Sequence, residues 1–300
     1  MKLIKPSFEI REQPSGLEGV YKQIERAGRV CYKSEDKIAE GTAKAFVDRM
    51  IASGHGAMLE HGTVYLKCET EVINRYIHPE DGEEEYFNKL EKYEYNSYSV
   101  TSDDGIYLYV TTNLRVLVEN DWLDDLQYIC EPTEYHEKRI TVQFTCDRGV
   151  SHEFVRHRVM SFAQESTRYC NYSKDKFSNE LTFIEPCWLE DYNYKDNTYN
   201  QLFIDSLRFA EAHYLDLLKK WDDKIPDKRY KTGFRNNPWT PQQARAVLPN
   251  ALKTELVMTG FVSDWKHFFE LRCSPNAHPQ ARELAIPLQE EFIARGYINN

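Results

Sequence analysis

Helix-like and strand-like segments follow one another along this chain without a regular order, and this irregularity limits the folds it can adopt. The clearest strand signal is residues 140–145, where apolar and polar side chains alternate. Further strands are predicted at residues 1–12, 63–68, 106–110, 181–184 and 256–258. Apolar residues recur at helical spacing in residues 16–29, 41–53, 114–123, 150–160, 198–221, 241–245, 262–271 and 281–295. Because no βαβ rhythm links them, we predict an α+β fold with a central, mainly antiparallel sheet.

The length of the chain sets how much core it can bury. With 300 residues, 41% hydrophobic and 29% charged, it is typical of a globular protein with one large domain or two small ones. There is no internal repeat and no low-complexity linker, so a single domain over residues 1–300 is predicted. Residues 74–105 are acidic, rich in tyrosine and poor in aliphatic side chains, which predicts a loop or surface excursion.

Several classes of protein are disfavoured by the same sequence. No apolar run is long enough to span a membrane, and residues 1–6 lack the apolar core of a signal peptide. A cytoplasmic location is therefore the default expectation. The seven cysteines are scattered without a Cys-x-x-Cys pair, which indicates reduced thiols rather than a disulfide framework or a zinc site. No metal site is expected.

Charge is distributed unevenly along the chain. The formal net charge of −10 argues against general affinity for nucleic acid, which needs a basic face. Basic side chains gather near the end of the predicted long helix and beyond it: Lys224, Lys228, Arg229, Lys231, Arg235 and Arg245, against Asp227 alone. An acidic protein with a local basic pocket suits a small anionic ligand better than a polymer.

The most densely charged stretch is residues 156–168. If residues 150–160 form one helix, successive side chains differ by about 100° around its axis. Arg156, His157 and Arg158 then cannot all point at one small group. They could reach different parts of one large ligand, or ligands in different subunits.

A second polar group follows directly. Gln164, Ser166 and Arg168 are spaced by two, so in an extended segment they would share one side. An amide, a hydroxyl and a guanidinium converging there would form a phosphate site. The simpler interpretation is a solvated helix end with ordinary ion pairs. We favour it for any single arginine but not for the whole pattern.

Arg156-His157-Arg158, followed by Ser166 and Arg168, resembles the signature of the flavin-dependent thymidylate synthases. Three further segments resemble motifs of that family in the same order. They are residues 55–61 (His-Gly-Ala-Met-Leu-Glu-His), 245–249 (Arg-Ala-Val-Leu-Pro) and 269–272 (Phe-Glu-Leu-Arg). The resemblance covers most of the chain, from about residue 20 to residue 295.

The resemblance implies a specific reaction. Members of the family convert dUMP to dTMP, with methylenetetrahydrofolate as the carbon donor and FAD, reduced by NADPH, as the source of hydride. They need no cysteine nucleophile, which agrees with the absence of any cysteine in an evidently activating setting here. The family is homotetrameric with active sites at subunit interfaces.

For dUMP, the resemblance implies a set of side chains in the second half of the chain. They are His152, Glu153, Gln164, Glu165, Ser166, Thr167, Arg168, Arg245 and Arg272. Arg168 and Arg245 would bind the phosphate. Arg272, the catalytic residue, would lie against the uracil and favour ionisation at N3, because a fixed cation stabilises negative charge developing there.

For FAD, the implied contacts come from both halves of the chain. They are His55, Ala57, Glu60, Arg156, His157, Arg158, Gln164, Phe261, Ser263 and His267. The Arg-His-Arg segment would hold the FAD of a neighbouring subunit, while His55, Glu60 and His267 would line the flavin.

Some positions depart from the family pattern. Glu153 stands where the family often has Gln. Its carboxylate would repel a phosphate ester unless another side chain pairs with it, and His157 is the candidate partner. Phe261 and Ser263 stand where many members use Asn and Arg on FAD. Residues 70–139 look like an insertion relative to compact members, and we expect them to elaborate the surface or the interface.

These departures leave other hypotheses open. One is a non-catalytic nucleotide-binding relative that keeps the dUMP pocket. A nucleic-acid-binding module is a third hypothesis, which the acidic net charge disfavours. His278 follows the Leu-Arg motif at a longer spacing than the family's histidine and is a further candidate near the flavin.

Overall fold

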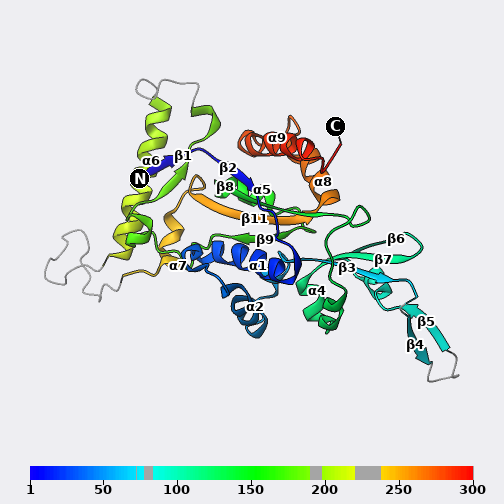
Figure 1. Cartoon of the computed structure of the whole chain (residues 1–300). Coiled ribbons are helices and arrows are strands. Elements are labelled where there is room, and N and C mark those ends of the chain that lie inside the picture. Colours follow the sequence, from blue (N-terminus) through cyan, green and yellow to red (C-terminus); the bar gives the residue numbers. More distant parts are fainter. Residues whose placement is uncertain (72, 78–83, 190–197, 220–237, 300) are drawn as a thin grey trace.

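The computed structural model describes residues 1–71, 73–77, 84–189, 198–219 and 238–299. At its centre lies a four-stranded antiparallel sheet (Figure 1). Its strand order is β2 (Ser7–Ile10), β8 (Arg139–Asp147), β11 (Lys253–Phe261) and β9 (Ser161–Gln164). Strands β8 and β11 pair along their whole length, from Asp147 opposite Lys253 to Arg139 opposite Phe261. The predicted α+β class and the central antiparallel sheet are confirmed.

One face of the central sheet carries a large apolar core. Ile140, Val142 and Phe144 of β8 lie in it, as the period of two in this strand predicts. Three helices cover this face (Figure 1): α5 (Arg148–Phe154), α8 (Val262–Arg272) and α9 (Pro279–Ala294). Trp265 of α8 is fully buried there, and its indole N–H donates to the backbone oxygen of Ile140 at 3.1 Å. The one polar atom of the indole is thereby satisfied inside the core.

The opposite face of the sheet is covered by α1 (Gly16–Tyr32) and α3 (Gly56–Leu59), and α2 (Thr42–Ala52) packs on the outer side of α1 (Figure 1). Ala27 of α1 packs in a small buried cluster with Ala163 and Val257 of the sheet. Helix α1 approaches α2 closely at Gly28, where an added Cβ would lie 2.5 Å from the ring of Phe46. The helices predicted at residues 16–29 and 41–53 are therefore confirmed.

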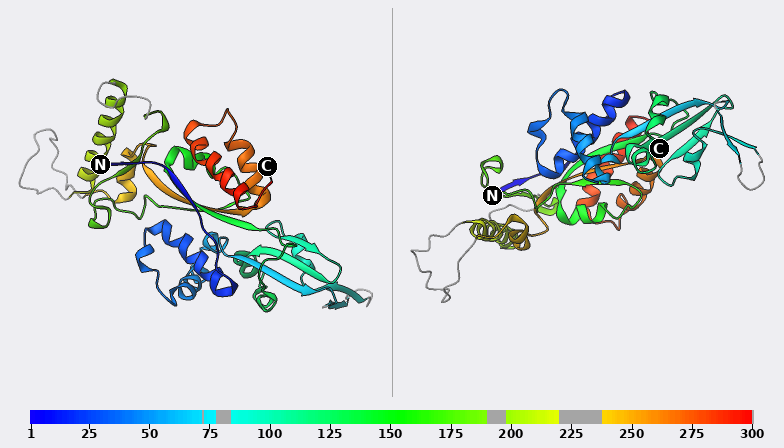
Figure 2. Two further views of the ribbon diagram at one scale, coloured as in Figure 1. Left: turned by 45° about the horizontal axis from the view of Figure 1, so that its top comes forward. Right: turned by 90° about the horizontal axis from the view of Figure 1, so that it is seen from below.

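A second core lies beside the central sheet. It is built on a three-stranded antiparallel sheet of β3 (Thr63–Glu69), β7 (Tyr107–Asn113) and β6 (Val100–Asp103), together with α4 (Leu114–Glu119) and the 3-10 helix η3 (Leu123–Tyr128). A hairpin of β4 (Ile73–Ile77) and β5 (Glu84–Asn88) extends from it. Figure 2 shows this part, in cyan and blue-green, forming one end of an elongated molecule.

Of the two alternatives predicted for residues 74–105, a loop or a surface excursion, the loop is wrong. These residues contain β5, β6, most of β4 and the 3-10 helix η2 (Glu91–Tyr95). Leu90 and Tyr93 are fully buried there, and the Tyr93 hydroxyl donates to Asp125 at 3.0 Å. The prediction relied on the scarcity of aliphatic side chains, but a buried aromatic ring whose hydroxyl is hydrogen-bonded can form the core in their place. That residues 70–139 are an insertion stays a prediction.

A third group of elements forms the other end of the molecule (Figure 1). Strand β1 (Lys2–Ile4) pairs in parallel with β10 (Thr182–Ile184), beside the long helix α6 (Thr198–Leu218). The strand predicted over residues 1–12 is thus two strands in two sheets. Pro6 lies between them, and a proline has no N–H with which to continue one ladder. The described residues also contain shorter elements: η1 (Glu35–Lys37), η4 (Asp175–Phe177), η5 (Cys187–Leu189), α7 (Pro241–Ala244) and η6 (Arg245–Val247).

Candidate active site

Residues 155–160 join α5 to β9 through turns instead of continuing the helix. The prediction of one helix over residues 150–160 is wrong in its second half, because α5 ends at Phe154. The backbone N–H of His157 donates to the oxygen of Phe154 at 3.3 Å, which closes the first turn. The chain leaves the helix here because Ser161 begins β9, which pairs with β11. Strand pairing therefore overrides a helix-like spacing.

The Arg-His-Arg segment points in more than one direction, as predicted. His157 is buried, with 7% of its surface exposed, whereas Arg156 and Arg158 are exposed. Arg156 lies 3.7 Å from the carboxylate of Glu153. Two guanidinium groups that face solvent on either side of a buried histidine can bind a phosphate-bearing ligand or another chain.

Arg272, at the end of α8, joins the two halves of this region. Its Nη1 donates to the carboxylate of Glu153 at 2.6 Å, and its Nη2 donates to the backbone oxygen of Glu153 at 2.5 Å. Its Nε donates to Nε2 of His157 at 3.1 Å. The expectation that His157 pairs with Glu153 is wrong, because Arg272 binds both of them. The fold thus brings together three predicted site residues from separate motifs.

His157 is a neutral partner in this cluster. Burial, followed by the positive charges of Arg272 and His267, lowers the pKa of His157 to about 4. Its Nε2 accepts the hydrogen bond from Arg272, so the ring proton lies on Nδ1. The ring packs 5.0 Å from that of Phe268. A neutral histidine orients the guanidinium without cancelling its charge.

Two arginines from different parts of the chain meet at the turn formed by residues 167–169. Nη1 of Arg245 donates to the Thr167 hydroxyl at 3.4 Å. Nε of Arg168 donates to the side-chain oxygen of Gln242 at 3.1 Å. Gln242 belongs to α7, which directly precedes Arg245, so α7 brings both guanidinium groups to the same turn. Two fixed positive charges beside a hydroxyl suit a phosphate.

The prediction that Gln164, Ser166 and Arg168 share one side of an extended segment is wrong beyond Ser166. Strand β9 ends at Gln164, and Arg168 lies in the turn. The Ser166 hydroxyl accepts from the backbone N–H of Arg168 at 3.3 Å, a bond typical of serine at a turn. Gln164 donates to the hydroxyl of Ser151 at 2.9 Å, which links β9 to α5.

Glu165 has partners inside the chain. Its side chain is buried, and its carboxylate accepts from the Tyr172 hydroxyl at 2.9 Å and from Lys253 at 2.8 Å. Lys253 also binds Glu255 at 2.6 Å, and Glu255 binds Lys33 at 2.9 Å. This row of alternating charges ties α1 to the sheet. A contact of Glu165 with dUMP stays a prediction, as does that of the exposed His152.

The predicted flavin residues Glu60 and Phe261 line one small cavity of about 110 Å³. The Glu60 carboxylate is bound by Arg115 at 2.5 Å. The ring of Phe261 is 8% exposed and lies 5.4 Å from the guanidinium carbon of Arg139. The cavity has room for a small group only, not for a whole dinucleotide.

The other predicted flavin residues lie around this region. His55 is the N-cap of α3, and Ala57 lies within that helix. The backbone N–H of Ser263 donates to Glu137 at 2.9 Å. His267 is exposed on α8. His278 is the N-cap of α9.

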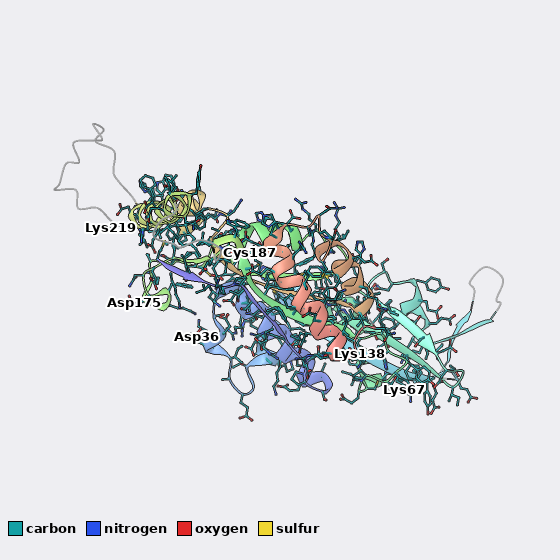
Figure 3. The ribbon with its side chains drawn as sticks, turned by 90° about the horizontal axis from the view of Figure 1, so that it is seen from above. Asp36, Lys67, Lys138, Asp175, Cys187 and Lys219 are labelled. Atoms are coloured by element: carbon teal, nitrogen blue, oxygen red, sulfur yellow. The ribbon has the colours of Figure 1, made fainter. Side chains whose placement is uncertain are left out.

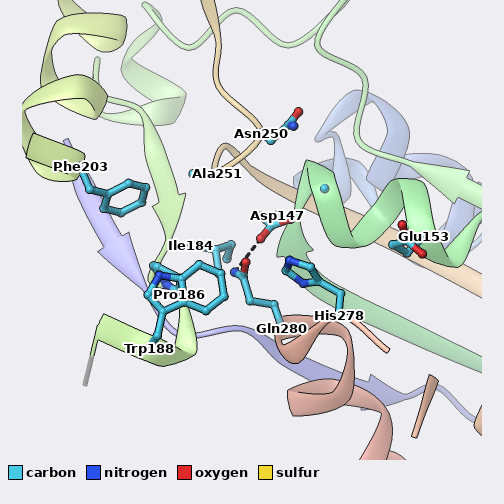
Figure 4. A pocket seen from close by; sticks show the side chains of 11 residues that line it. Asp147, Glu153, Ile184, Pro186, Trp188, Phe203, Asn250, Ala251, His278 and Gln280 are labelled. Carbon is cyan, nitrogen blue, oxygen red and sulfur yellow. Dashed lines mark hydrogen bonds between the residues drawn. The ribbon is translucent and has the colours of Figure 1, made fainter. Parts of the chain in front are cut away.

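A cavity of about 330 Å³ adjoins the Arg272 cluster through Glu153. Figure 4 shows Asp147 and Gln280 joined by a hydrogen bond inside it, with Trp188 on one side and His278 and Glu153 on the other. The Asp147–Gln280 distance is 2.7 Å. A cavity with an aromatic wall and buried polar groups can hold a small ligand.

Some expectations concern residues that the structure does not describe. Of the basic side chains between residues 224 and 245, only Arg245 lies within the described ranges. Within those ranges, no helix is long and apolar enough to cross a membrane. The same residues contain no group of three side chains that could hold a metal ion. All seven cysteines are described, and none forms a disulfide.

Comparison with known proteins identifies the family. A family model described as thymidylate synthase complementing protein, Thy1, matches residues 132–295, which is more than half of the chain. The chain belongs to the Thy1 family. The Thy1 match contains the Arg-His-Arg segment, the phosphate-side arginines and Arg272, whereas the predicted flavin loop at residues 55–61 lies outside it.

Curated Thy1 relatives carry a shared name. A flavin-dependent thymidylate synthase of Mycolicibacterium gilvum is 34% identical over 147 residues, covering 49% of this chain and 54% of that protein. One of Mycobacterium tuberculosis is 32% identical over 147 residues with the same coverage. The chain thus spans about half the length of the curated relatives it matches. A solved UMP/dUMP methylase PolB from Streptomyces cacaoi covers 98% of this chain and 93% of that one, at 16% identity and a TM-score of 0.42.

Sequence reasoning missed several polar contacts within this Thy1 fold. Gln242 holds Arg168, Arg115 holds Glu60, and Ser151 holds Gln164. Gln242 alone has a sequence signal, since it lies three residues before Arg245 at a predicted helix start, where both side chains share one side. The others depend on pairings between distant segments.

Proposed function

We propose that this chain is a flavin-dependent thymidylate synthase, which methylates dUMP to dTMP with methylenetetrahydrofolate as the carbon donor and NADPH as the reductant. One observation carries the proposal. Matched segments that are far apart in the sequence meet in the fold, Arg272 with Glu153 and Arg245 with Thr167. The name of the relatives in the matched half, flavin-dependent thymidylate synthase, supports the same reaction.

In this proposal Ser166 and the turn at residues 167–169 form the phosphate end of the dUMP site. Arg168 and Arg245 would bind the phosphate, and the hydroxyls of Ser166 and Thr167 would donate to its oxygens. Gln242 already holds Arg168 by a hydrogen bond of 3.1 Å, which lowers the conformational entropy lost when a ligand binds.

Arg272 would lie against the uracil and stabilise the negative charge that develops at N3. The side chain is largely buried, at 12% exposure, and three hydrogen bonds to Glu153 and His157 hold it in place. Because an arginine does not lose its proton, the charge is constant over the working pH range. A preorganised cation of this kind stabilises a transition state without reorganisation.

The chain has side chains that fit FAD, which would supply the hydride when bound and reduced. The exposed guanidinium groups of Arg156 and Arg158 suit its phosphates. Because they point into solvent, the FAD they hold would belong to a neighbouring subunit, within a homotetramer with shared active sites. We place this tetramer in the cytoplasm, where its thiols would stay reduced.

The thiols support chemistry that uses no cysteine nucleophile. Burial raises the pKa of Cys31 to about 11, and burial also raises that of Cys273. Both lie near segments that match the family, as does Cys170, two residues after Arg168, and burial raises the pKa of Cys170 too. None of the three is poised as a thiolate at neutral pH, so none is set up to attack the uracil ring.

A non-catalytic nucleotide-binding protein is the second candidate. The residues predicted to contact FAD motivate it. The Glu60 carboxylate is already paired with Arg115, and the Phe261 ring, which lies beside the Arg139 guanidinium, has no polar side-chain atom to bind a cofactor. Such a protein would bind dUMP through Arg168 and Arg245 and form no product.

The visible spectrum of the purified protein, before and after adding NADPH and dUMP, distinguishes the two. A flavin-dependent enzyme is yellow, or becomes yellow with added FAD, and bleaches on reduction. Tritium release from dUMP labelled at C5, with methylenetetrahydrofolate present, then reports turnover. A protein that stays colourless with FAD would overturn the proposal, while a thermal shift with dUMP but no product would favour the second candidate.

A further inference from the structure

None of the predicted nucleotide and flavin residues lines a further cavity of about 310 Å³, although Arg139 lines both this cavity and the smaller one with Glu60 and Phe261. Its walls come from residues 10–16 between β2 and α1, and from the starts of β3 and β8, with Thr63 and Arg139. Lys138 and Tyr297 close it on another side, and Figure 3 labels Lys138 beside the C-terminal end of α9. Four segments that are distant in the sequence therefore build one site.

Arg139 is 8% exposed, yet its guanidinium has only uncharged partners. Nη1 donates to the backbone oxygen of Glu60 at 3.0 Å and to the Thr63 hydroxyl at 3.3 Å. Nη2 donates to the Ser161 hydroxyl at 3.3 Å. Nε is buried and has no hydrogen-bond partner. The side chain of Glu60 is itself bound by Arg115.

Such an arrangement is electrostatically incomplete. Burial lowers the pKa of Arg139 to about 10, which still leaves the group charged at neutral pH. A buried cation is unfavourable unless a counter-charge accompanies it. No ion pair of Arg139 with another described residue is found. The charges of Glu60 and Asp264 act on Arg139 without forming an ion pair with it, so a bound anion would supply the direct counter-charge that the described residues lack.

Further positive groups surround the same cavity. Nε of Arg11 is also buried without a partner, although its Nη2 binds Glu9 at 2.9 Å. Lys138 contributes an ammonium group. Helix α1 begins here at Gly16, and its N-cap Ser15 makes no side-chain cap bond. The positive end of a helix with uncapped N–H groups attracts anions.

Two carboxylates line the cavity as well. Glu12 is bound by Arg295 at 2.9 Å, and Glu131 is exposed to solvent. Glu12 is thereby neutralised from outside the cavity, and Glu131 is screened by water. Arg139 is then left as the buried cation of this cavity without a paired carboxylate, while Arg11, 24% exposed, is paired with Glu9.

We propose that this cavity binds a small molecule through an anionic group, a phosphate or a carboxylate, held by Arg139 and Arg11 at the start of α1. The planar fork of a guanidinium matches both groups. Ligand cavities range from about 300 to 1,000 Å³, so this one takes a small metabolite rather than a polymer. The site is separate from the dUMP phosphate site and goes beyond the proposed function.

Calorimetric titration of the full chain with inorganic phosphate, pyrophosphate and succinate tests this, at an ionic strength held constant with chloride. We expect binding of at least one probe, weakened roughly tenfold or more in Arg139→Gln. Preference for the phosphates or for succinate then assigns the ligand class. Arg208→Gln, at an exposed arginine on α6, is the matched control and is expected to bind normally.

Two further variants keep the test decisive. Lys138→Gln changes an exposed side chain, so it is expected to fold normally and to bind the probe severalfold more weakly. Arg245→Gln is expected to retain this binding, because that residue belongs to the proposed dUMP site. Loss in Arg245→Gln but not in Arg139→Gln would place the anion on the dUMP site and overturn the inference. Unchanged binding in both Arg139→Gln and Lys138→Gln would also overturn it. The same holds if the wild-type protein binds none of the three probes, including the case in which Arg139→Gln changes only the oligomeric mass.

Discussion

At the scale of the residue, Arg272 is held by one charged partner and one neutral partner. Glu153 accepts two hydrogen bonds from it, one by the carboxylate and one by the backbone. His157 accepts the third and stays neutral, because its pKa is lowered to about 4. The guanidinium is therefore fixed from two directions while part of its charge remains available to a ligand.

Replacing Arg272 with alanine is expected to lower kcat by about a hundredfold or more, the usual cost of removing one preorganised charge. The fold should survive, because Glu153 is 32% exposed and its carboxylate can reach water once the arginine is gone. Tritium release measures kcat, and the melting temperature reports folding. Arg208→Ala, on the exposed side of α6, should turn over normally. Normal turnover in Arg272→Ala would remove its catalytic role.

His61 makes the protein sensitive to acid. It is fully buried, and burial lowers the pKa of His61 to about 3. Between about pH 6.5 and pH 3 the unfolded chain binds a proton here that the folded chain does not. The unfolded state then binds more protons, so the free energy of unfolding falls as the pH falls through this window, by up to about 1.4 kcal/mol per unit.

Urea denaturation at several pH values from about 7 down to 4 measures this slope. His61→Gln removes one titrating group and should reduce the slope, even if it lowers stability at neutral pH, while His157, whose pKa is also lowered, contributes to the slope that remains. His213→Gln, at an exposed histidine on α6, should leave the slope unchanged. Equal slopes in the wild type and in His61→Gln would show that another group controls acid unfolding.

The residues of the candidate site could be predicted from their spacing, but their partners could not. The matched segments contained Glu153, His157 and Arg272, and the structure joins them. The prediction paired His157 with Glu153, whereas Arg272 binds both, because a guanidinium with several donors can bind a carboxylate and an imidazole together. Arg139 had no sequence signal at all, since its burial depends on β3, β8 and β9 meeting.

At the scale of the element, one carboxylate connects two helices. Oδ1 of Asp147 accepts from the backbone N–H of Val150 at 2.7 Å and so caps α5. Oδ2 accepts from the side chain of Gln280 in the first turn of α9 at 2.7 Å. Asp147 is 5% exposed, and burial raises its pKa. The carboxylate thus positions both helices around the cavity that adjoins Glu153.

Asp147→Ala is expected to lower the free energy of unfolding by about 2–3 kcal/mol, the sum of a lost helix cap and a lost buried hydrogen bond. Gln280→Ala should cost about 1 kcal/mol. The double variant should cost less than the sum, because both single changes remove the same bond. Urea denaturation of the four proteins measures the coupling. Strict additivity would show that the two side chains do not cooperate.

Elements with a strong pattern could be predicted, whereas those created by pairing could not. The strand β8 and the helices α1, α2 and α8 follow their apolar spacing closely. Strand β9 was missed, because Ser161–Gln164 is too short to show a period and becomes a strand only beside β11. The same pairing ends α5 early. Strands β5 and β6 were missed because their region buries aromatic rings such as Tyr93.

At the scale of the whole molecule, the proposed function gives the exposed Arg156 and Arg158 a ligand that belongs to a second chain. The molecule is elongated (Figure 2), with the central sheet between two smaller groups of elements. The Thy1 match covers the sheet strands β8, β9 and β11, and the helices packed on one face. A homotetramer in which one chain supplies Arg156 and another supplies Arg168 follows from the proposed function.

Mixing two inactive variants tests this sharing. Arg156→Ala and Arg168→Ala should each have little activity. In randomly mixed tetramers about one quarter of the sites would take both arginines from intact positions. Unfolding and refolding an equimolar mixture should therefore restore about a quarter of wild-type kcat, measured by tritium release. Mixtures that stay inactive would mean that both arginines act within one chain.

The outward direction of Arg156 and Arg158 on either side of buried His157 has a further consequence for assays. If the site forms only where two chains meet, the amount of active enzyme follows the association equilibrium. Specific activity would then fall on dilution, although every single chain stays folded. Ligands that bind across the interface would shift this equilibrium toward the assembled form. Activity measured against protein concentration would thus report assembly as well as chemistry.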